Sequence, residues 1–201
     1  MINQFTNINE IYMTIVLYGD NKVGTTSLLR RYLYDTFTSY FYKRKTDYQR
    51  LNLDFDNGKK LNLKFWDIYH YRTYCNKIFL KQANGYMLTY DKTNRDSFLN
   101  IRNHLDEIKE YTIGGDIPIA LIGCKEDLYE REEITREEGE KFANDNNLIF
   151  FETSAKTDYN VIESFSELIS RIYEKNQNIL ESNNGIYLRK KIRRAKRGCL
   201  K

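Results

Sequence analysis

The stretch from Gly19 to Leu28, GDNKVGTTSL, has the residue types and the spacing of a loop that binds phosphate. Two glycines are separated by four residues, and a hydroxyl residue stands two positions after the second glycine. Glycines let the backbone approach an anion closely, and the amide groups that begin the following helix favour negative charge. The residues expected to contact phosphate are Gly19, Asp20, Asn21, Lys22, Val23, Gly24, Thr25 and Thr26.

The phosphate-loop pattern requires a lysine where this chain has Thr25. A hydrogen bond to a charged group contributes roughly 1.5 to 3 kcal/mol, so its loss lowers an affinity by about one to two powers of ten. Lys22 lies three positions earlier and offers a partial substitute, although no feature of the sequence directs its side chain inward. The alternative is a strand-to-helix turn that no longer binds phosphate.

The segments on either side of the loop are those that a phosphate site requires. Residues 11–18, IYMTIVLY, are apolar and rich in β-branched and aromatic residues, as is typical of a strand buried on both faces. Helical spacing follows the loop at Leu28, Leu29, Tyr32 and Leu33. The order of strand, glycine loop and helix is the context in which the motif binds phosphate.

The rest of the chain alternates between strand and helix patterns. Asn57 and Gly58 join two alternating segments, residues 50–56 and 59–67, and predict an antiparallel hairpin. Further strands are predicted at 85–91, 118–123 and 148–153, and helices at about 97–111, 136–146 and 161–174. This order predicts an α/β fold with a mainly parallel six-stranded sheet, one antiparallel strand, and helices on both faces. Ligands bind such sheets at the carboxyl ends of the strands.

Length and charge divide the chain into three expected parts. We expect an N-terminal extension at 1–10, one domain at 11–176 and a flexible basic tail at 177–201. The formal net charge is +4, but residues 185–201 hold eight of the 32 Lys and Arg residues and no acid. The remainder therefore carries 24 basic against 28 acidic residues, and the basic patch is terminal.

The sequence gives no sign of secretion or of a membrane span. Its apolar runs are of strand length, and its first ten residues lack the basic and apolar regions of a secretory signal. The three cysteines, Cys75, Cys124 and Cys199, are scattered and match no metal-ligand spacing. We therefore expect a reduced, cytosolic setting.

Five segments in order, YDTFTSYF, NGKKLNLKFWD, YMLTYDKTNRDSF, IGCKEDL and FETSAK, resemble those of the Ras superfamily of small GTPases and, within it, the Rab branch. The resemblance covers roughly residues 11–174. It implies a P-loop NTPase-type fold, GTP and GDP as ligands, and Mg²⁺ as cofactor. It also implies that effector and exchange proteins bind through residues 37–75.

The resemblance assigns the guanine base to two segments. Asp127 would accept hydrogen bonds from guanine N1 and N2, which adenine cannot offer, and the Lys125 stem would cover one face of the ring. In TSAK, which contains Ser154 and Lys156, the Ala155 backbone N–H would bind guanine O6. These two elements disfavour a P-loop kinase or another ATP-using enzyme. Taken in isolation, Ser154 would serve equally well as a helix N-cap.

Phe37 and Cys124 are two further positions that the resemblance places near the base. Phe37 would stack on guanine by resemblance, and it could equally be an ordinary packing residue. Cys124 stands where the family has asparagine, so it lacks the amide that braces the base loop to the phosphate loop. This substitution weakens the expected site without changing its preference for guanine.

The Mg²⁺ side of the expected site departs from the family pattern. By resemblance Thr26 and Asp67 would hold the metal. The first switch has Arg44 where the family has a metal-binding threonine, and a guanidinium offers no lone pair to a metal. Arg44 either meets phosphate directly or is solvated. Thr46 could serve only if the loop register slips by two residues.

The second switch departs furthest, in the run DIYHYRTY that begins at Asp67. His70 occupies the place of the family's glycine, and Tyr71 that of the glutamine that orients the attacking water. No glycine lies between Gly58 and Gly85. We therefore expect intrinsic GTP hydrolysis to be very slow or absent. A water-positioning role for His70 is the alternative to an ordinary surface or packing role.

The basic tail ends with Cys199 third from the terminus. Rab-type proteins are prenylated on C-terminal cysteines, but Cys-Leu-Lys is neither the four-residue signal nor a paired-cysteine end. The basic residues favour an anionic membrane surface, where stable anchoring needs a lipid as second signal. Binding of nucleic acid, nuclear import and simple solvation are the weaker alternatives.

The leading hypothesis is a divergent, Rab-like guanine-nucleotide-binding protein that acts in vesicle trafficking on the cytosolic face of intracellular membranes. We expect it to retain the guanine site and to have lost the hydrolytic machinery. The competing hypothesis is a pseudo-GTPase scaffold that binds nucleotide weakly or not at all.

Overall fold

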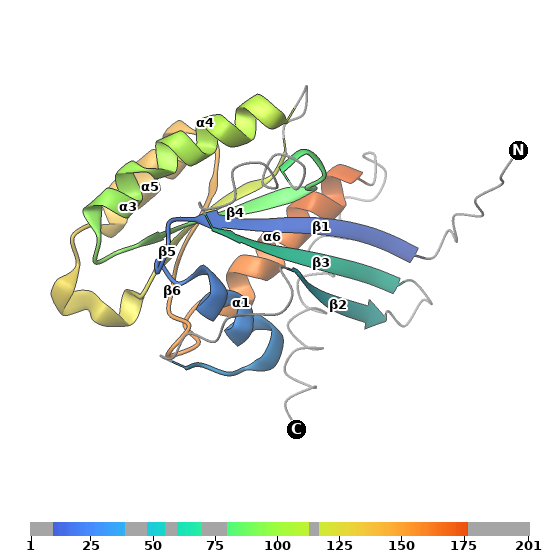
Figure 1. Ribbon diagram of the computed structural model, residues 1–201, viewed down its shortest axis with the longest axis horizontal. Helices are drawn as coiled ribbons and strands as arrows, with labels where there is room; N and C mark the ends of the chain where they lie inside the picture. Colours follow the sequence, from blue (N-terminus) through green and yellow to red (C-terminus); the bar gives the residue numbers. More distant parts are fainter. Residues whose placement is uncertain (1–9, 39–47, 55–59, 70–79, 113–116, 177–201) are drawn as a thin grey trace, which may run out of the picture.

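The computed structural model describes residues 10–38, 48–54, 60–69, 80–112 and 117–176 (Figure 1). The strands are β1 Glu10–Gly19, β2 Tyr48–Asp54, β3 Lys60–Tyr69, β4 Gly85–Asp91, β5 Ile119–Cys124 and β6 Ile149–Thr153. The helices are α1 Thr25–Tyr34, α3 Arg95–Leu99, α4 Ile101–Tyr111, the 3₁₀ helix η1 Glu126–Arg131, α5 Arg136–Asp145 and α6 Val161–Asn176.

The six strands form one sheet in the order β2-β3-β1-β4-β5-β6. The pair β2 and β3 is antiparallel, and all other neighbouring pairs are parallel. The predicted fold class is therefore confirmed. The hairpin pairing is confirmed as well, with Asp54 opposite Lys60, whereas Asn57 and Gly58 lie outside the described residues.

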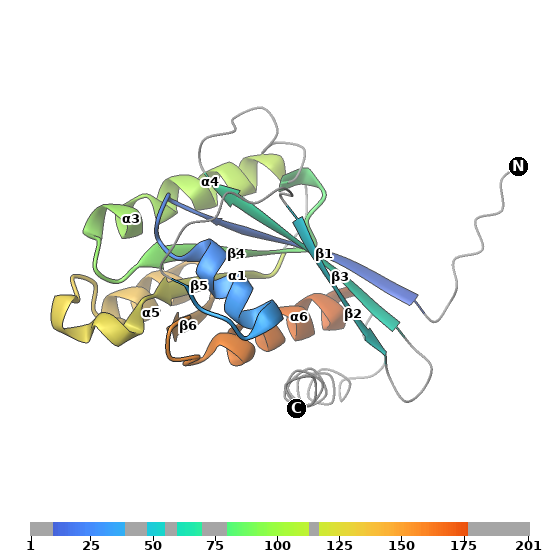
Figure 2. The ribbon, with the colours of Figure 1, turned by 60° about the horizontal axis from the view of Figure 1, so that its bottom comes forward.

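Helices cover both faces of this sheet, and each face has its own apolar core. Figure 2 shows α1 and α6 on one side of the sheet and α4 on the other. On the first face Leu29 of α1 and Phe165 of α6 are fully buried, and on the second face Leu105 of α4 packs among the buried residues. The central strands β1 and β4 touch both cores, which explains their continuous apolar sequences.

Two helical features differ from the sequence prediction. The helix predicted at 97–111 is two helices, α3 and α4, which meet at Asn100. It also begins earlier, because the Asn94 side chain accepts a hydrogen bond from Ser97 N at 3.2 Å and so caps α3. The short helix η1 after Lys125 was not predicted.

The carboxyl ends of the parallel strands meet at one edge of the sheet. Gly19 lies opposite Thr89 of β4, Asp91 opposite Cys124, and Cys124 opposite Thr153. Gly19 is required here for close packing, because a Cβ atom at that position would lie 2.3 Å from the Thr89 carbonyl oxygen. The phosphate loop therefore leaves the same edge of the sheet as the two loops predicted to bind the base, which follow β5 at Cys124 and β6 at Thr153. These two loops are called the base loops below.

Candidate nucleotide-binding site

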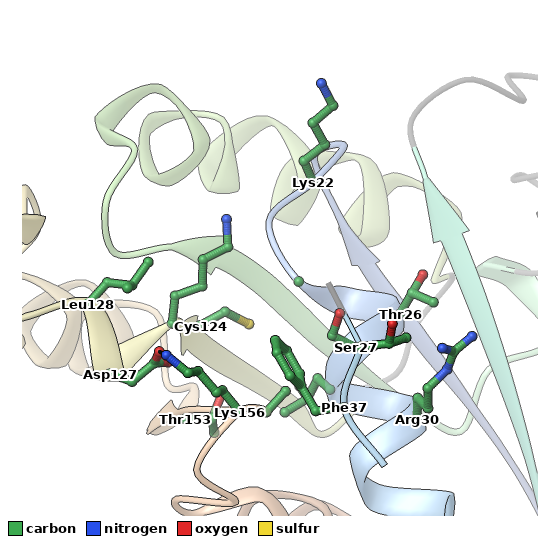
Figure 3. Close-up of a pocket in the computed structure, with 15 residues that line it drawn as sticks. Lys22, Thr26, Ser27, Arg30, Phe37, Cys124, Asp127, Leu128, Thr153 and Lys156 are labelled. Atoms are coloured by element: carbon green, nitrogen blue, oxygen red, sulfur yellow. Dashed lines mark ion pairs between the residues drawn. The ribbon is translucent and has the colours of Figure 1, made fainter. Parts of the chain in front are cut away.

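A cavity of about 700 Å³ lies at this edge, between α1 and the loops that follow β5 and β6 (Figure 3). Its volume is in the range of small-molecule and cofactor sites. The residues that were predicted from the sequence and line it are Lys22, Gly24, Thr26, Phe37, Lys125, Asp127, Ala155 and Lys156. The structure thus brings together segments that are more than 100 residues apart in the chain.

The phosphate loop itself encloses a second, much smaller hollow of about 20 Å³. Among the predicted residues, Asp20, Asn21 and Thr25 border this hollow and not the large cavity. Gly24 has a φ of 118°, which favours glycine, and it precedes α1 directly. No side chain caps α1, and its first turn holds no acidic residue among those described. Its first amide groups can therefore receive an anion.

Thr25 is turned toward the sheet. Its side chain is buried, and its Oγ1 lies 2.8 Å from Oγ1 of Thr89. The Thr89 hydroxyl in turn donates to the Tyr18 carbonyl at 3.3 Å. The residue at the lysine position therefore supplies no cation to the loop and is part of the packing between α1 and β4.

Lys22 is exposed and has a φ of 66°. It borders both the cavity and the hollow, but Figure 3 shows its Nζ pointing away from Thr26 and Ser27. In this conformation Lys22 does not take the place of the missing lysine. Arg44, the other candidate, lies outside the described residues.

Asp20 connects the phosphate loop to helix α4, a contact that the sequence did not indicate. Its carboxylate accepts a hydrogen bond from Asn100 Nδ2 at 2.7 Å and lies 2.9 Å from His104 Nε2. The His104 ring is buried and packs on the Tyr18 ring with 4.6 Å between centroids. These contacts hold the Asp20 carboxylate, which is the negative charge of the phosphate loop, against the start of α4.

Thr26 and Asp67 lie together, as a shared metal site requires. Thr26 Oγ1 donates to Asp67 Oδ2 at 2.6 Å. Mg²⁺ prefers oxygen ligands and is usually held by one or two carboxylates together with phosphates and water. Within the described residues no three His, Cys, Asp or Glu side chains form a metal cluster. The pair therefore fits a Mg²⁺ ion that is held mainly by a nucleotide's phosphates.

The two base loops are joined through Asp127 and Ser154. Asp127 Oδ1 accepts from Ser154 Oγ at 2.6 Å, and Asp127 Oδ2 lies 3.8 Å from Lys156 Nζ. Ser154 Oγ also accepts from the backbone N–H groups of Lys156 and Thr157 at 3.2 and 3.1 Å. Because α6 begins only at Val161, Ser154 closes a turn and is not the N-cap of a helix.

Lys125 borders the cavity while its charge is held elsewhere. Its Nζ lies 2.5 Å from Oδ2 of Asp91, a buried carboxylate at the end of β4. With the ammonium group fixed in this way, the aliphatic stem is what Lys125 offers to a flat ligand. Its φ of 66° is uncommon for a residue other than glycine.

Cys124 stands where the family has asparagine, and it packs closely against the phosphate loop. A Cβ atom at Gly24 would lie only 3.4 Å from the Cys124 Cβ, so the two loops touch at this point. The thiol is buried, and burial raises its pKa to about 12. It therefore stays protonated and unreactive at neutral pH.

Phe37 extends from the segment after α1 into the same cavity. Its side chain is 42% exposed, and Figure 3 shows the ring pointing toward Cys124, between Ser27 on one side and Lys156 on the other. A partly exposed aromatic ring that borders a cavity is available for stacking. The Phe37 ring is therefore placed where it could stack on a flat ligand in the cavity.

The sequence profile of the Ras family matches residues 14–174. The chain belongs to the Ras family. It is 36% identical over 174 residues to Ras-related protein Rab-8A of Pongo abelii, covering 85% of this chain and 83% of that protein. Human Ras-related protein Rab-8B is equally similar over 175 residues, with the same shares covered. Human EF-hand calcium-binding domain-containing protein 4B is 34% identical over 170 residues, which are 83% of this chain and 23% of that protein.

The predicted resemblance is thus confirmed as that of a divergent, Rab-like small GTPase. Six residues on which the sequence-based predictions of this Ras-family chain depend lie outside the described residues, namely Arg44, Thr46, His70, Tyr71, Cys75 and Cys199. Of the predicted partner-binding region, residues 37–38, 48–54 and 60–69 are described. No helix in the described ranges is long and apolar enough to cross a bilayer.

Arg31 is a supporting residue that the sequence analysis missed. From α1 its Nε donates to the Ala155 carbonyl at 2.7 Å, and its Nη2 donates to the Lys156 carbonyl at 3.2 Å. Its Nη1 bonds the Asp35 carboxylate at 2.8 Å. The Arg31 guanidinium therefore connects the loop at Ala155 and Lys156 to helix α1. It also connects that loop to Asp35, which follows α1 and lies two positions before Phe37.

A buried ion pair supports the start of this same base loop. Lys92 Nζ lies 2.7 Å from Glu152 and 3.2 Å from Glu132, while Arg136 Nη1 lies 3.2 Å from Glu152. Burial lowers the pKa of Lys92, but the hydrogen bonds and charges of Glu152 and Glu132 together outweigh burial, so the pKa is raised overall. Glu152 directly precedes the TSAK segment, which these contacts fix against β4 and α5.

Proposed function

We propose that this chain is a guanine-nucleotide-binding, Rab-like small GTPase that recruits partner proteins in vesicle trafficking and hydrolyses GTP poorly. The observation that carries the proposal is the cavity that the phosphate loop shares with Asp127, whose carboxylate is bonded to Ser154. Family membership and the relatives named Rab-8A and Rab-8B support it. In this proposal, effector and exchange proteins bind to the chain through residues 37–75.

Each part of the nucleotide has a place in this proposal. The base lies between Phe37 and the Lys125 stem, with Asp127 accepting from its N1 and N2 groups and the Ala155 N–H meeting O6. The phosphates lie at the N-terminus of α1, where the amide groups after Gly24 carry partial positive charge. The cavity volume of about 700 Å³ and the uncapped helix support this placement.

Mg²⁺ would be held by the oxygens of Thr26 and Asp67 together with the phosphates, and would offset the phosphates' negative charge. The separation of 2.6 Å between Thr26 Oγ1 and Asp67 Oδ2 supports this pairing, because both oxygens can face one ion. The substitution at Arg44 removes one further ligand that the family pattern provides.

The proposed loss of hydrolysis rests on the phosphate and water side of the site. Thr25 is neutral, so it supplies no positive charge to stabilise a developing negative charge, and its hydroxyl is bonded to that of Thr89. Tyr71 stands in place of the water-orienting glutamine, and His70 in place of the glycine. In this proposal any switching comes from nucleotide exchange or from partner-assisted hydrolysis.

The proposal places the protein on the cytosolic face of intracellular membranes. The eight basic residues of 185–201 favour an anionic surface by about 1 kcal/mol per residue near the membrane. A lipid on Cys199 would add the second signal that stable anchoring needs. Detergent partitioning of the protein from its native cells, before and after Cys199→Ser, tests this part: an unchanged distribution would contradict lipidation.

A pseudo-GTPase scaffold is the second candidate, and one observation favours it. The phosphate loop has a buried threonine at the lysine position, already bonded within the protein. In this alternative the fold presents protein-binding surfaces and the cavity holds no nucleotide at working concentrations.

Titration of nucleotide-free protein separates the two candidates. The protein is stripped with EDTA and titrated with fluorescent GDP, GTP and ADP, each with and without Mg²⁺. We expect saturable binding of both guanine nucleotides and at least about tenfold weaker binding of ADP, because Asp127 has no matching donors on adenine. Absence of saturation by any guanine nucleotide would contradict the proposal and support the scaffold.

Hydrolysis is tested by single-turnover measurements on protein loaded with GTP. We expect the natural chain to hydrolyse GTP far more slowly than an intact Rab protein measured beside it. The double variant Thr25→Lys with Tyr71→Gln should hydrolyse GTP faster than the natural chain. A natural chain as fast as the intact Rab would overturn the account of the second switch.

A further inference from the structure

Arg30 lies on helix α1 one turn after Thr26 and borders the large cavity. Residues four apart on a helix share a face, so Arg30 stands directly behind the proposed metal-binding hydroxyl. Arg30 is half-buried, unlike the exposed Lys22. It is therefore a cation on the cavity side of the helix that begins at the phosphate loop.

The Arg30 side chain is directed toward the phosphate end of the cavity. Long side chains on a helix lean toward its N-terminus. Figure 3 shows the Arg30 guanidinium on the same side of α1 as Thr26, with its nitrogens turned toward the Thr26 end of the helix. The phosphate loop lies at that end.

The Arg30 guanidinium differs from the neighbouring cations in having no hydrogen-bond or ion-pair partner among the described residues. Arg31 bonds the Ala155 and Lys156 carbonyls, and Lys125 is held by Asp91. Within the part of the chain that the structure describes, Arg30 forms no hydrogen bond or ion pair. A half-buried guanidinium that makes no such contact has all its N–H donors available for an anion such as a phosphate.

We infer that Arg30 binds the terminal phosphate of a nucleoside triphosphate beside Thr26, and so supplies part of the charge that the lysine missing at Thr25 would have provided. This inference rests on the proposed nucleotide function and goes further by naming the residue that senses the third phosphate. A guanidinium suits this role, since its planar fork can bind two phosphate oxygens at once. A diphosphate lacks the terminal group, so the contact favours GTP over GDP.

The test compares Arg30→Gln and Arg30→Lys with the natural chain and with the control Arg102→Gln, which removes an exposed arginine from α4. Each protein is stripped of nucleotide and titrated, with Mg²⁺ present, with fluorescent GDP and a fluorescent non-hydrolysable GTP analogue. Thermal unfolding of each variant checks that the fold is kept.

We expect Arg30→Gln to weaken binding of the GTP analogue by about 10- to 100-fold and that of GDP by less than about threefold. The affinity of Arg30→Lys for the GTP analogue should lie between those of Arg30→Gln and the natural chain. Arg102→Gln should bind both nucleotides as the natural chain does. Equal losses for both nucleotides, or no loss for either, would overturn the inference while leaving the proposed function standing. A natural chain that binds neither nucleotide would overturn both.

Discussion

The hydroxyl oxygens of Thr25 and Thr89 lie 2.8 Å apart, one at the start of α1 and the other within β4. The position at which the phosphate-loop pattern has lysine therefore belongs to the packing of this domain. On the opposite side of the cavity, Asp127 and Ser154 are bonded at 2.6 Å, as a rigid base site requires. The two residues proposed to meet the base side of a nucleotide are thus bonded to each other, whereas the lysine position of the phosphate loop holds a buried threonine.

Restoring the lysine should strengthen nucleotide binding. Thr25→Lys adds a cation at the phosphate loop, and we expect the affinity for GDP and GTP to rise by about one to two powers of ten. Stopped-flow dissociation of fluorescent GDP gives the comparison. The matched control is Thr25→Val, which removes only the hydroxyl; it should lower the free energy of unfolding by about 1 kcal/mol and leave the GTP-to-GDP preference unchanged. An affinity that Thr25→Lys does not change would mean that phosphates do not bind at this loop.

Asp127 should determine the preference for guanine. Asp127→Asn keeps one oxygen to accept from Ser154 but replaces the second acceptor by a donor. We expect GDP binding to weaken by about 10- to 100-fold, with a smaller loss for IDP, which lacks the 2-amino group. Competition titrations of GDP against IDP measure both losses. Glu126→Gln, one residue earlier, is the control and should change neither; a GDP-to-IDP ratio that Asp127→Asn leaves intact would place the base elsewhere.

Arg31 should hold the base loop in place. Arg31→Ala removes its hydrogen bonds to the Ala155 and Lys156 carbonyls, and we expect GDP to dissociate roughly tenfold faster. Arg171→Ala removes an exposed arginine of α6 that bonds only Glu167 among the described residues, and should leave the dissociation rate unchanged. Equal rates in natural and Arg31→Ala protein would show that the base loop keeps its shape without this tie.

The buried thiol of Cys124 predicts a loss of stability at high pH. Its pKa is raised from the reference 9.0 to about 12 by burial, so from about pH 9 upward the unfolded chain loses this proton before the folded chain does. The contribution of the protonated thiol to the free energy of unfolding is fully present below pH 9 and falls as the pH rises toward 12. Urea unfolding of the natural chain and of Cys124→Ala at pH 7 and pH 10 isolates it: the natural chain should lose more stability than the variant. Equal losses would show that the thiol is not desolvated.

Much of the fold followed from local patterns in the sequence. The apolar run at 11–18, the glycine loop and the helical spacing after it predicted β1, the loop and α1, because burial on both faces and a strand-to-helix turn leave clear signals. The break at Asn100 left no such signal, since its φ of −68° and ψ of −17° are helical. The pattern could not show that α3 and α4 are separate helices.

The contacts that support the candidate site could not be predicted from local patterns. Arg31 and Ala155 are 124 positions apart, and Asp20 and His104 are 84 apart. No regular spacing in the sequence predicts either contact, because each depends on how the helices and strands pack at the edge of the sheet. Lys92 and Glu152 similarly become a buried pair only when β4 and β6 lie on either side of β5.

We propose that this chain retains a guanine nucleotide although the phosphate side of its site is altered. The most direct test is to denature freshly purified protein and to identify and quantify the released nucleotide by chromatography, after purification with Mg²⁺ and, separately, with EDTA. We predict close to one guanine nucleotide per protein molecule with Mg²⁺ and less with EDTA. Protein that releases no nucleotide, and that guanine nucleotides then fail to saturate, would contradict the account.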